Sequence, residues 1–294
     1  MKKLLLATMI AAACGTASAQ VSLSGKASYW YSNTEVGTAK TKSIAAEPTS
    51  NVAVTATEKL GMGLTARVAV ETSLSGNNVD GSNDTRLGDR QSTVGLAHRL
   101  GSVDLGRNVH SQFLAVSNND AFSTLIGSVA GDVHNLRGLR LSNATFIAVN
   151  AIPGVVLNLD RSQAGTAGAE ATAMGGSVSM FGLNASVARF EQGAERSDVV
   201  GANYKISNTT LFYSHSDNKG AVASKGDLAG VRHQMGALAV KASYGRTDRD
   251  VKAWNIGSDY SLSKRTEVGI AFRNVDQVAQ VDIKQVSVGL THRF

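Results

Sequence analysis

The chain ends with the stretch Gln285-Val286-Ser287-Val288-Gly289-Leu290-Thr291-His292-Arg293-Phe294. Every second side chain from Val286 onward is large and mostly apolar, whereas the side chains between them are polar or very small. Successive side chains of a β-strand point to opposite faces, so this strict alternation predicts a strand with one apolar and one polar face.

The same alternation recurs along the chain, with turn signals between the segments. Clear examples are residues 21–31, 64–71, 238–245 and 267–273. The chain has 30 glycines and only two prolines, which suits a sheet because proline cannot donate a hydrogen bond to a strand ladder. An all-β fold follows. In a soluble sandwich the apolar faces would form a core, and in a membrane barrel they would face lipid.

The connectors between these segments favour the barrel. Short connectors are expected at residues 59–63, 100–102, 151–154, 181–182, 207–208, 235–236 and 263–265, and longer ones at 33–50, 75–88 and 216–225. Short turns at one rim and long loops at the other are typical of a transmembrane antiparallel β-barrel. If residues 20–294 form sixteen strands, each strand together with its connector has about 17 residues, which leaves room for strands of roughly 9–11 residues. Fourteen strands remain an alternative.

The N-terminus has the parts of a secretory signal peptide. Lys2 and Lys3 precede an apolar run at residues 4–13, and Ala17-Ser18-Ala19 forms a small-residue cleavage site. A run of about ten apolar residues is too short for a membrane-spanning helix, which needs roughly 20. We therefore expect a signal peptide at residues 1–19 and a single domain at residues 20–294. The alternative of a lipoprotein signal at Cys14 lacks the leucine expected at position 11.

Composition excludes several classes of function. Cys14 is the only cysteine, so residues 20–294 can form neither a disulfide nor a cysteine-ligated metal site. Without Lys2 and Lys3, 27 basic residues stand against 23 acidic ones, with no run of Lys or Arg that would indicate a nucleic-acid partner. No G-x-S-x-G, phosphate-binding loop or H-E-x-x-H motif is present, and the histidines are scattered. We expect no enzyme activity, cofactor or metal.

The longest connector covers residues 108–138. A loop of this length is usually functional or disordered, and a disordered loop would be more uniformly polar. This one contains apolar side chains such as Phe113, Phe122 and Ile126. It is therefore expected to fold against the inside of the barrel wall.

Several segments together resemble the general porins of Gram-negative outer membranes, most closely those of β-proteobacteria and Neisseria. They are Glu58-Lys59-Leu60-Gly61-Met62-Gly63-Leu64-Thr65-Ala66, Asp89-Arg90-Gln91-Ser92-Thr93-Val94-Gly95-Leu96, Gly101-Ser102-Val103-Asp104-Leu105-Gly106-Arg107-Asn108, and the ending from Tyr260 to Phe294. The resemblance implies a 16-stranded homotrimeric barrel in the outer membrane that lets small hydrophilic solutes and ions diffuse passively. It also implies that the third long loop folds into the lumen, with acidic residues facing basic residues on the wall.

The resemblance and the strand parity nominate the basic residues of this constriction. The family match places Lys26, Arg90 and Arg140 on the wall. Parity points Lys26, Arg67, Arg140 and Lys241 inward, opposite the apolar face of each strand. Parity is ambiguous for Arg90, because it would share a face with apolar neighbours in its strand. The alternative is that these residues are scattered, solvated surface charges.

The acidic residues of the loop are Asp120 and Asp132. Asp120 lies nearer the centre of the loop and is expected to face the wall cations, whereas Asp132 could equally cap a turn. Because basic residues outnumber acidic ones at this level, the sequence predicts a weak preference for anions.

The C-terminal strand is expected to pair with residues 21–33, because closure of the barrel removes unpaired strand edges that hydrocarbon would not tolerate. The resemblance assigns Phe294 as an assembly signal. A barrel acting as an adhesin or a hydrolase instead of an open channel remains the alternative.

Overall fold

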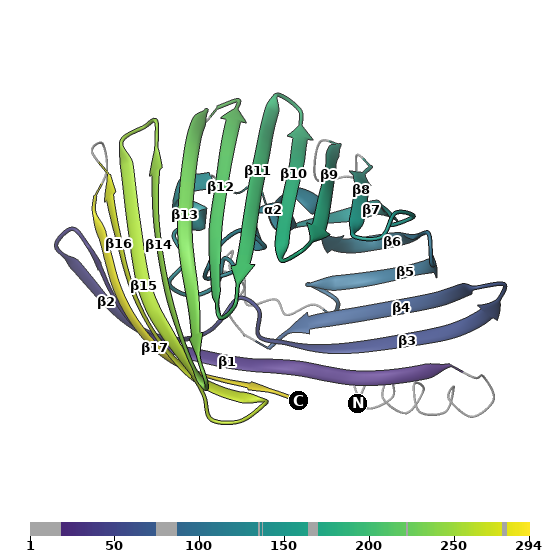
Figure 1. Cartoon of the computed structure of the whole chain (residues 1–294), viewed down its shortest axis with the longest axis horizontal. Coiled ribbons are helices and arrows are strands. Elements are labelled where there is room, and N and C mark those ends of the chain that lie inside the picture. Colours follow the sequence, from purple (N-terminus) through teal and green to yellow (C-terminus); the bar gives the residue numbers. More distant parts are fainter. Residues whose placement is uncertain are drawn as a thin grey trace.

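The structure is a computed structural model that describes residues 19–74, 87–134, 136, 138–163, 170–221, 223–277 and 281–294. Within these ranges the chain is almost entirely β-strand, arranged as a ring with a helical segment inside it (Figure 1). Nearly all of the expected signal peptide and most of the expected connector at residues 75–88 lie outside the described residues. No helix in the described part of the chain is long and apolar enough to cross a membrane.

The strands are β1 (Gln20–Val36), β2 (Ala39–Ala46), β3 (Asn51–Gly61), β4 (Leu64–Ser73), β5 (Gln91–His98), β6 (Gly101–Val109), β7 (Arg140–Val149), β8 (Val155–Ser162), β9 (Ala171–Met180), β10 (Leu183–Gln192), β11 (Glu195–Ile206), β12 (Thr209–Lys219), β13 (Ser224–Met235), β14 (Leu238–Thr247), β15 (Val251–Ser261), β16 (Thr266–Gln277) and β17 (Ile283–Arg293). The helices are α2 (Ser111–Ser117) and α3 (Ala130–His134).

The sheet closes between its first and last strands. β17 pairs with β1 in antiparallel register from Lys26 opposite Arg293 to Val36 opposite Ile283. On its other edge, β1 pairs first with β3 and then with β2, so these two strands together occupy one position in the ring. The 17 strands therefore form a closed barrel with 16 positions, as predicted, and the alternative of 14 is excluded. Closure is confirmed, and its register lies slightly farther along β1 than residues 21–33.

The short turns lie where the sequence predicts them. The turn between β9 and β10 consists of Phe181 and Gly182, with φ angles of 48° and 82°. Two residues with positive φ form the turn type that best matches the right-handed twist of a hairpin. Positive φ values at Met62 and Ser207 mark the equivalent turns between β3 and β4 and between β11 and β12.

The long connectors expected at residues 33–50 and 216–225 are largely strand. β1 continues to Val36 and turns through Gly37 into β2, whereas β12 continues to Lys219. These connectors were predicted wrongly because the extensions carry polar side chains on both faces, such as Lys40 and Thr41 in β2, so no hydrophobic alternation marks them. These extensions are strands because their backbone groups pair with the neighbouring strand in the antiparallel ladder.

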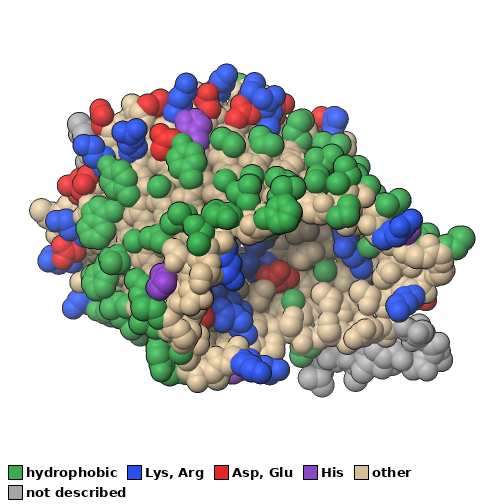
Figure 2. Space-filling view, in the orientation of Figure 1, with side chains coloured by type: hydrophobic (Ala, Val, Ile, Leu, Met, Phe, Trp, Pro, Cys, Tyr) green, Lys and Arg blue, Asp and Glu red, His purple; other side chains and the backbone are tan. Residues whose placement is uncertain are grey.

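The two faces of the wall differ as the alternation predicts. In β17, Val286, Val288 and Leu290 are exposed, whereas Ser287 and Thr291, which belong to the alternate set, are buried. Apolar side chains form a broad zone on the outer surface, and Lys, Arg, Asp and Glu side chains are visible within the hollow of the barrel (Figure 2). An apolar exterior with a polar interior is the arrangement of a barrel that spans a membrane.

The segment between β6 and β7 packs on the inward face of the wall. Helix α2 contacts strands β8 to β11, and α3 contacts β12 to β15. Val116, Val129 and Val133 of this segment form a buried cluster with small or branched wall residues such as Ala188 and Leu228. Loop and wall thus share a buried apolar cluster to which the apolar side chains of this connector contribute.

Glycines in the wall make room for α3. A Cβ atom added to Gly245 would lie 2.5 Å from Cγ2 of Val133, and one added to Gly226 would overlap the carbonyl oxygen of Val133. Any larger residue at these two positions would therefore push α3 away from the wall. Gly226 of β13 and Gly245 of β14 therefore form part of the wall surface on which α3 packs.

Candidate functional site

The C-terminal end of the loop is held by His134. Both of its ring nitrogens are hydrogen-bonded to hydroxyl groups of β12, Nδ1 to Ser216 at 2.9 Å and Nε2 to Ser214 at 2.8 Å. Burial lowers the pKa of His134 to about 4, so the imidazole is neutral at neutral pH. Since a neutral imidazole donates through one nitrogen and accepts through the other, the two serines take opposite roles.

The N-terminal end of the loop is held by the neighbouring strands β8, β10 and β11, of which β11 pairs with β12. The Ser111 backbone N–H donates to the Asp160 carboxylate of β8 at 2.7 Å, and the Gln112 amide donates to Ser197 of β11 at 3.0 Å. His110 stacks on Phe190 of β10 with a centroid distance of 4.9 Å. These contacts fix the first turn of α2 to the wall.

The centre of the loop lies against strands near the closure of the barrel. Phe122 packs in a buried cluster with Trp30 of β1 and Ala271 of β16. The ammonium group of Lys241 lies 4.6 Å from the centroid of the Phe122 ring, and the Asn255 amide donates to the Gly127 carbonyl at 2.5 Å. The loop is therefore attached to the inner wall from β8 round to β1.

The wall cations expected from the sequence are paired with carboxylates. Lys26 forms an ion pair with Glu47, Arg67 a two-point ion pair with Asp104, and Arg90 an ion pair with Glu71. Arg90 also donates to the carbonyl oxygen of Pro48. It lies in the bend before β5, which is why strand parity could not assign its direction.

Lys241 follows the same rule, because its ammonium group lies 2.8 Å from the Asp259 carboxylate of β15. Arg293 forms an ion pair with Glu267 at 2.8 Å, near the rim of the barrel that carries the short turns. The inner wall therefore carries matched pairs of both signs, and the surplus of positive charge is smaller than a count of basic residues suggests.

Arg140 is placed differently. It begins β7, and the guanidinium groups of Arg90 and Arg107 and the carboxylates of Glu71 and Asp89 act on it electrostatically. Its Nε atom is buried and has no hydrogen-bond partner within the described residues. A bulge farther along β7, where Asn143 has a φ of 52°, breaks the alternation of the strand, so parity does not determine the direction of Arg140.

The two loop acids, both expected at the constriction, make different contacts. Asp120 is buried and accepts hydrogen bonds from the backbone of Thr124 at 2.8 Å and from the Ser128 hydroxyl at 2.6 Å. Burial raises its pKa, and these hydrogen bonds oppose the rise. Asp132 is the acid that reaches a wall cation, because both of its oxygens accept from Nη2 of Arg273 at 2.5 and 2.6 Å.

The hydrogen bonds of Asp120 shape a tight turn within the loop, and the nearby charge of Lys241 also opposes the rise in its pKa that burial causes. Arg273 was not nominated from the sequence. The signal was available, because Arg273 alternates with the outward-facing Val268, Ile270 and Phe272 of β16.

Comparison with known proteins identifies the family. Residues 6–280 match the family model described as Gram-negative porin. The chain belongs to the Gram-negative porin family. No curated protein matches its sequence.

Solved structures of other porins share the fold. The anion-selective porin from Comamonas acidovorans has a TM-score of 0.81 at 20% identity, covering 94% of this chain and 100% of the other. OmpT of Vibrio cholerae, in a form that lacks loop L8, has a TM-score of 0.76 at 10% identity, covering 94% and 99%. A mutant of the Rh. blastica porin has a TM-score of 0.74 at 19% identity, covering 94% and 100%.

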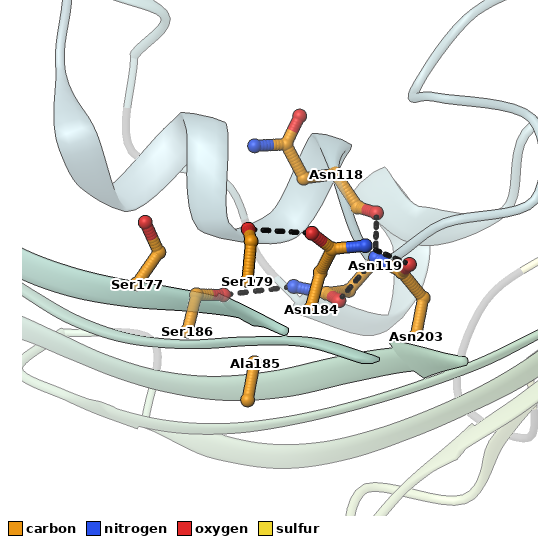
Figure 3. A pocket seen from close by; sticks show the side chains of 8 residues that line it. All are labelled: Asn118, Asn119, Ser177, Ser179, Asn184, Ala185, Ser186 and Asn203. Carbon is orange, nitrogen blue, oxygen red and sulfur yellow. Dashed lines mark hydrogen bonds between the residues drawn. The ribbon is translucent and has the colours of Figure 1, made fainter. Parts of the chain in front are cut away.

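In the described part of the porin, cavities lie beside both ends of α2. The larger, of about 300 Å³, lies at the C-terminal end of the helix and is lined by asparagine and serine side chains of the loop and of β9 to β11 (Figure 3). The smaller, of about 170 Å³, lies at the N-terminal end beside Arg67, Asp104 and Asp160. Within the described residues, no group of three or more His, Cys, Asp or Glu side chains could hold a metal ion.

Proposed function

We propose that this porin forms a water-filled channel in the outer membrane through which small hydrophilic solutes and ions diffuse passively, without a cofactor or a chemical step. One observation carries the proposal: the closed antiparallel wall exposes apolar residues outward and encloses a hollow with ionic and polar residues. Closure pairs the strand edges, which hydrocarbon requires, and the polar interior can hold water. The loop that carries α2 and α3 narrows the lumen.

The channel prefers anions weakly. Arg90, Arg107 and Arg140 lie together, and the carboxylates nearest to them are Glu71 and Asp89. Low-dielectric walls focus such a field into the water of a pore. The preference is weak because other cations near the loop have carboxylate partners, among them Lys26, Arg67, Lys241 and Arg273. The porin from Comamonas acidovorans that shares the fold is anion-selective, which agrees in sign.

The remaining parts of the proposal concern export and assembly. Residues 1–19 would be removed as a signal peptide, and residues 20–294 would form one barrel domain that assembles as a homotrimer in contact with outer-membrane lipid. Support comes from the positive and apolar parts of the N-terminus and from the family.

The proposal is tested by the conductance and reversal potential of the refolded protein in a planar bilayer with a potassium chloride gradient. We expect stepwise insertions and a small reversal potential of the sign for chloride preference. Arg140→Gln should move it toward potassium, whereas Arg161→Gln, which alters an exposed pair on the outer face, should not. Absence of conductance from a folded, β-rich protein would favour the adhesin or hydrolase alternative, and clear potassium preference would contradict the selectivity.

A further inference from the structure

The larger cavity beside α2 differs in chemistry from the rest of the inner wall. Asn118 and Asn119 line it from the loop, and Ser177, Asn184, Ser186 and Asn203 line it from β9, β10 and β11 (Figure 3). All of these side chains are uncharged hydrogen-bonding groups. Elsewhere near the loop the wall also carries ion pairs, such as Arg67–Asp104, Lys241–Asp259 and Arg273–Asp132.

A network of hydrogen bonds holds these groups in place. The Asn184 amide donates to Asn203 at 3.0 Å and accepts from the Ser179 hydroxyl at 2.6 Å. The Asn119 amide donates to Ser186 at 2.8 Å, and Asn203 donates to the Asn118 carbonyl at 3.0 Å. The last two contacts join the loop to the wall, so the cavity has its shape only while the loop is docked.

The network leaves hydrogen-bonding capacity at the cavity. An asparagine amide has two N–H donors and an oxygen with two lone pairs, and Asn184 uses one of each kind in the contacts above. Ser186 accepts from Asn119 and keeps its own hydroxyl hydrogen. The side chains of Asn118 and Ser177 take part in no hydrogen bond that joins the residues drawn in Figure 3.

We propose that this cavity is a weak subsite for a neutral polyhydroxylated solute of about the size of one sugar ring, an inference that rests on the proposed channel function. Neighbouring hydroxyl groups of such a solute both donate and accept, which matches mixed amide and hydroxyl groups. Uncharged groups give ions no advantage. A volume of about 300 Å³ is at the lower end of ligand cavities, so it suits a single ring.

Weak binding is what a diffusion channel requires, because a solute must be able both to enter a site and to leave it. The cavity residues named above include no aromatic side chain on which a sugar face could stack. Each hydrogen bond also replaces one to water, so its net contribution is small. The subsite would therefore delay a sugar briefly in the lumen.

The test is a titration of single-channel potassium chloride conductance with D-glucose and, separately, with tetraethylene glycol. The two solutes are similar in size, but the glycol has ether oxygens in place of most hydroxyl donors. The variants are Asn184→Ala and Ser177→Ala, the latter leaving the network intact. Asn158→Ala, on the inner face of β8 beside the other cavity, is the matched control.

We expect glucose to lower the wild-type conductance saturably, whereas the glycol lowers it only in proportion to concentration. Asn184→Ala should weaken the apparent glucose affinity about three- to tenfold, and Ser177→Ala about twofold, since net hydrogen-bond contributions are modest. Asn158→Ala should leave it unchanged.

Identical responses to the two solutes in the wild-type channel would overturn the subsite. The subsite would also be overturned if the Asn184→Ala and Asn158→Ala channels had the same apparent affinity for glucose. In both cases normal potassium chloride conductance shows that the channel itself is intact. A folded protein that conducts no ions would instead contradict the proposed function.

Discussion

Nη2 of Arg273 on β16 donates to both carboxylate oxygens of Asp132 on α3, at 2.5 and 2.6 Å. The pair joins the inner loop to β16, the neighbour of the closing strand β17, and both side chains are mostly buried. It therefore connects the position of α3 to the charge inside the lumen.

Asp132→Asn should loosen the loop and increase anion preference, because it removes both a charge-assisted contact and a negative charge. Contacts of this kind contribute about 1.5–3 kcal/mol. We expect greater open-channel current noise and a reversal potential shifted toward chloride. Glu170→Gln, in an exposed ion pair at the rim, is the control. Unchanged noise and selectivity in Asp132→Asn would show that the ion pair does not hold the loop.

Acid should weaken the attachment of α3 through His134. Its pKa is about 4 in the folded protein and about 6.5 when unfolded, so the unfolded chain binds more protons between these values. The contribution of His134 to stability is therefore full above pH 6.5, is lost as the pH falls from 6.5 to 4, and changes no further below 4. His134→Gln keeps one donor and one acceptor but cannot titrate.

The measurement for His134 is open-channel noise from pH 7 to pH 4. Wild type should become noisier over this window, whereas His134→Gln should respond much less. His233→Gln, at an exposed position of β13, should behave as wild type. Equal pH responses in wild type and His134→Gln would remove His134 from this account.

Gly245→Ala should displace α3, because the added Cβ would lie 2.5 Å from Val133. Overpacking of this kind costs about 1–3 kcal/mol. We expect altered conductance and greater noise. Gly131→Ala is the matched control within α3: its Cβ would meet nothing within 4 Å, and alanine favours a helix. Unchanged conductance and noise in Gly245→Ala would mean that the wall can adjust at this point and that the added methyl group does not displace α3.

Deletion of Phe294 should impair assembly, as predicted from the resemblance. Its backbone exchanges two hydrogen bonds of 3.0 Å with Gly25, and its ring covers the site where a Cβ of Gly25 would stand. The deletion therefore opens the closing edge. We expect a lower yield of folded trimer in the outer membrane, measured by its electrophoretic mobility with and without heating. Phe294→Tyr should assemble normally, and normal assembly of the deletion would contradict the assignment.

Alternation alone was enough to predict the wall, because each strand segment between lipid and water repeats the same two-residue pattern. It failed where strands extend beyond the apolar zone, as at Lys40 and Lys42, and where a bulge at Asn143 shifts the register.

The loop was harder to predict in detail. Its docking followed from apolar residues such as Phe122, but the direction of each acid depends on three-dimensional contacts. The carboxylate of Asp120 turns back to its own backbone at Thr124, whereas Asp132 reaches Arg273, 141 residues away in sequence. The asparagine and serine cavity had no sequence signal, since its residues come from separate elements.

Single cysteines at neighbouring positions of β8 test the central claim most directly. Residues 20–294 contain no cysteine, so each introduced thiol is unique. Asn158 faces the interior beside Asp160, whereas Leu159 is exposed on the outer face. The measurement is single-channel conductance before and after a cationic methanethiosulfonate reagent. The account predicts that conductance falls for Asn158→Cys and not for Leu159→Cys. Loss of conductance at position 159 alone, or a response at neither position from a folded and labelled protein, would contradict it.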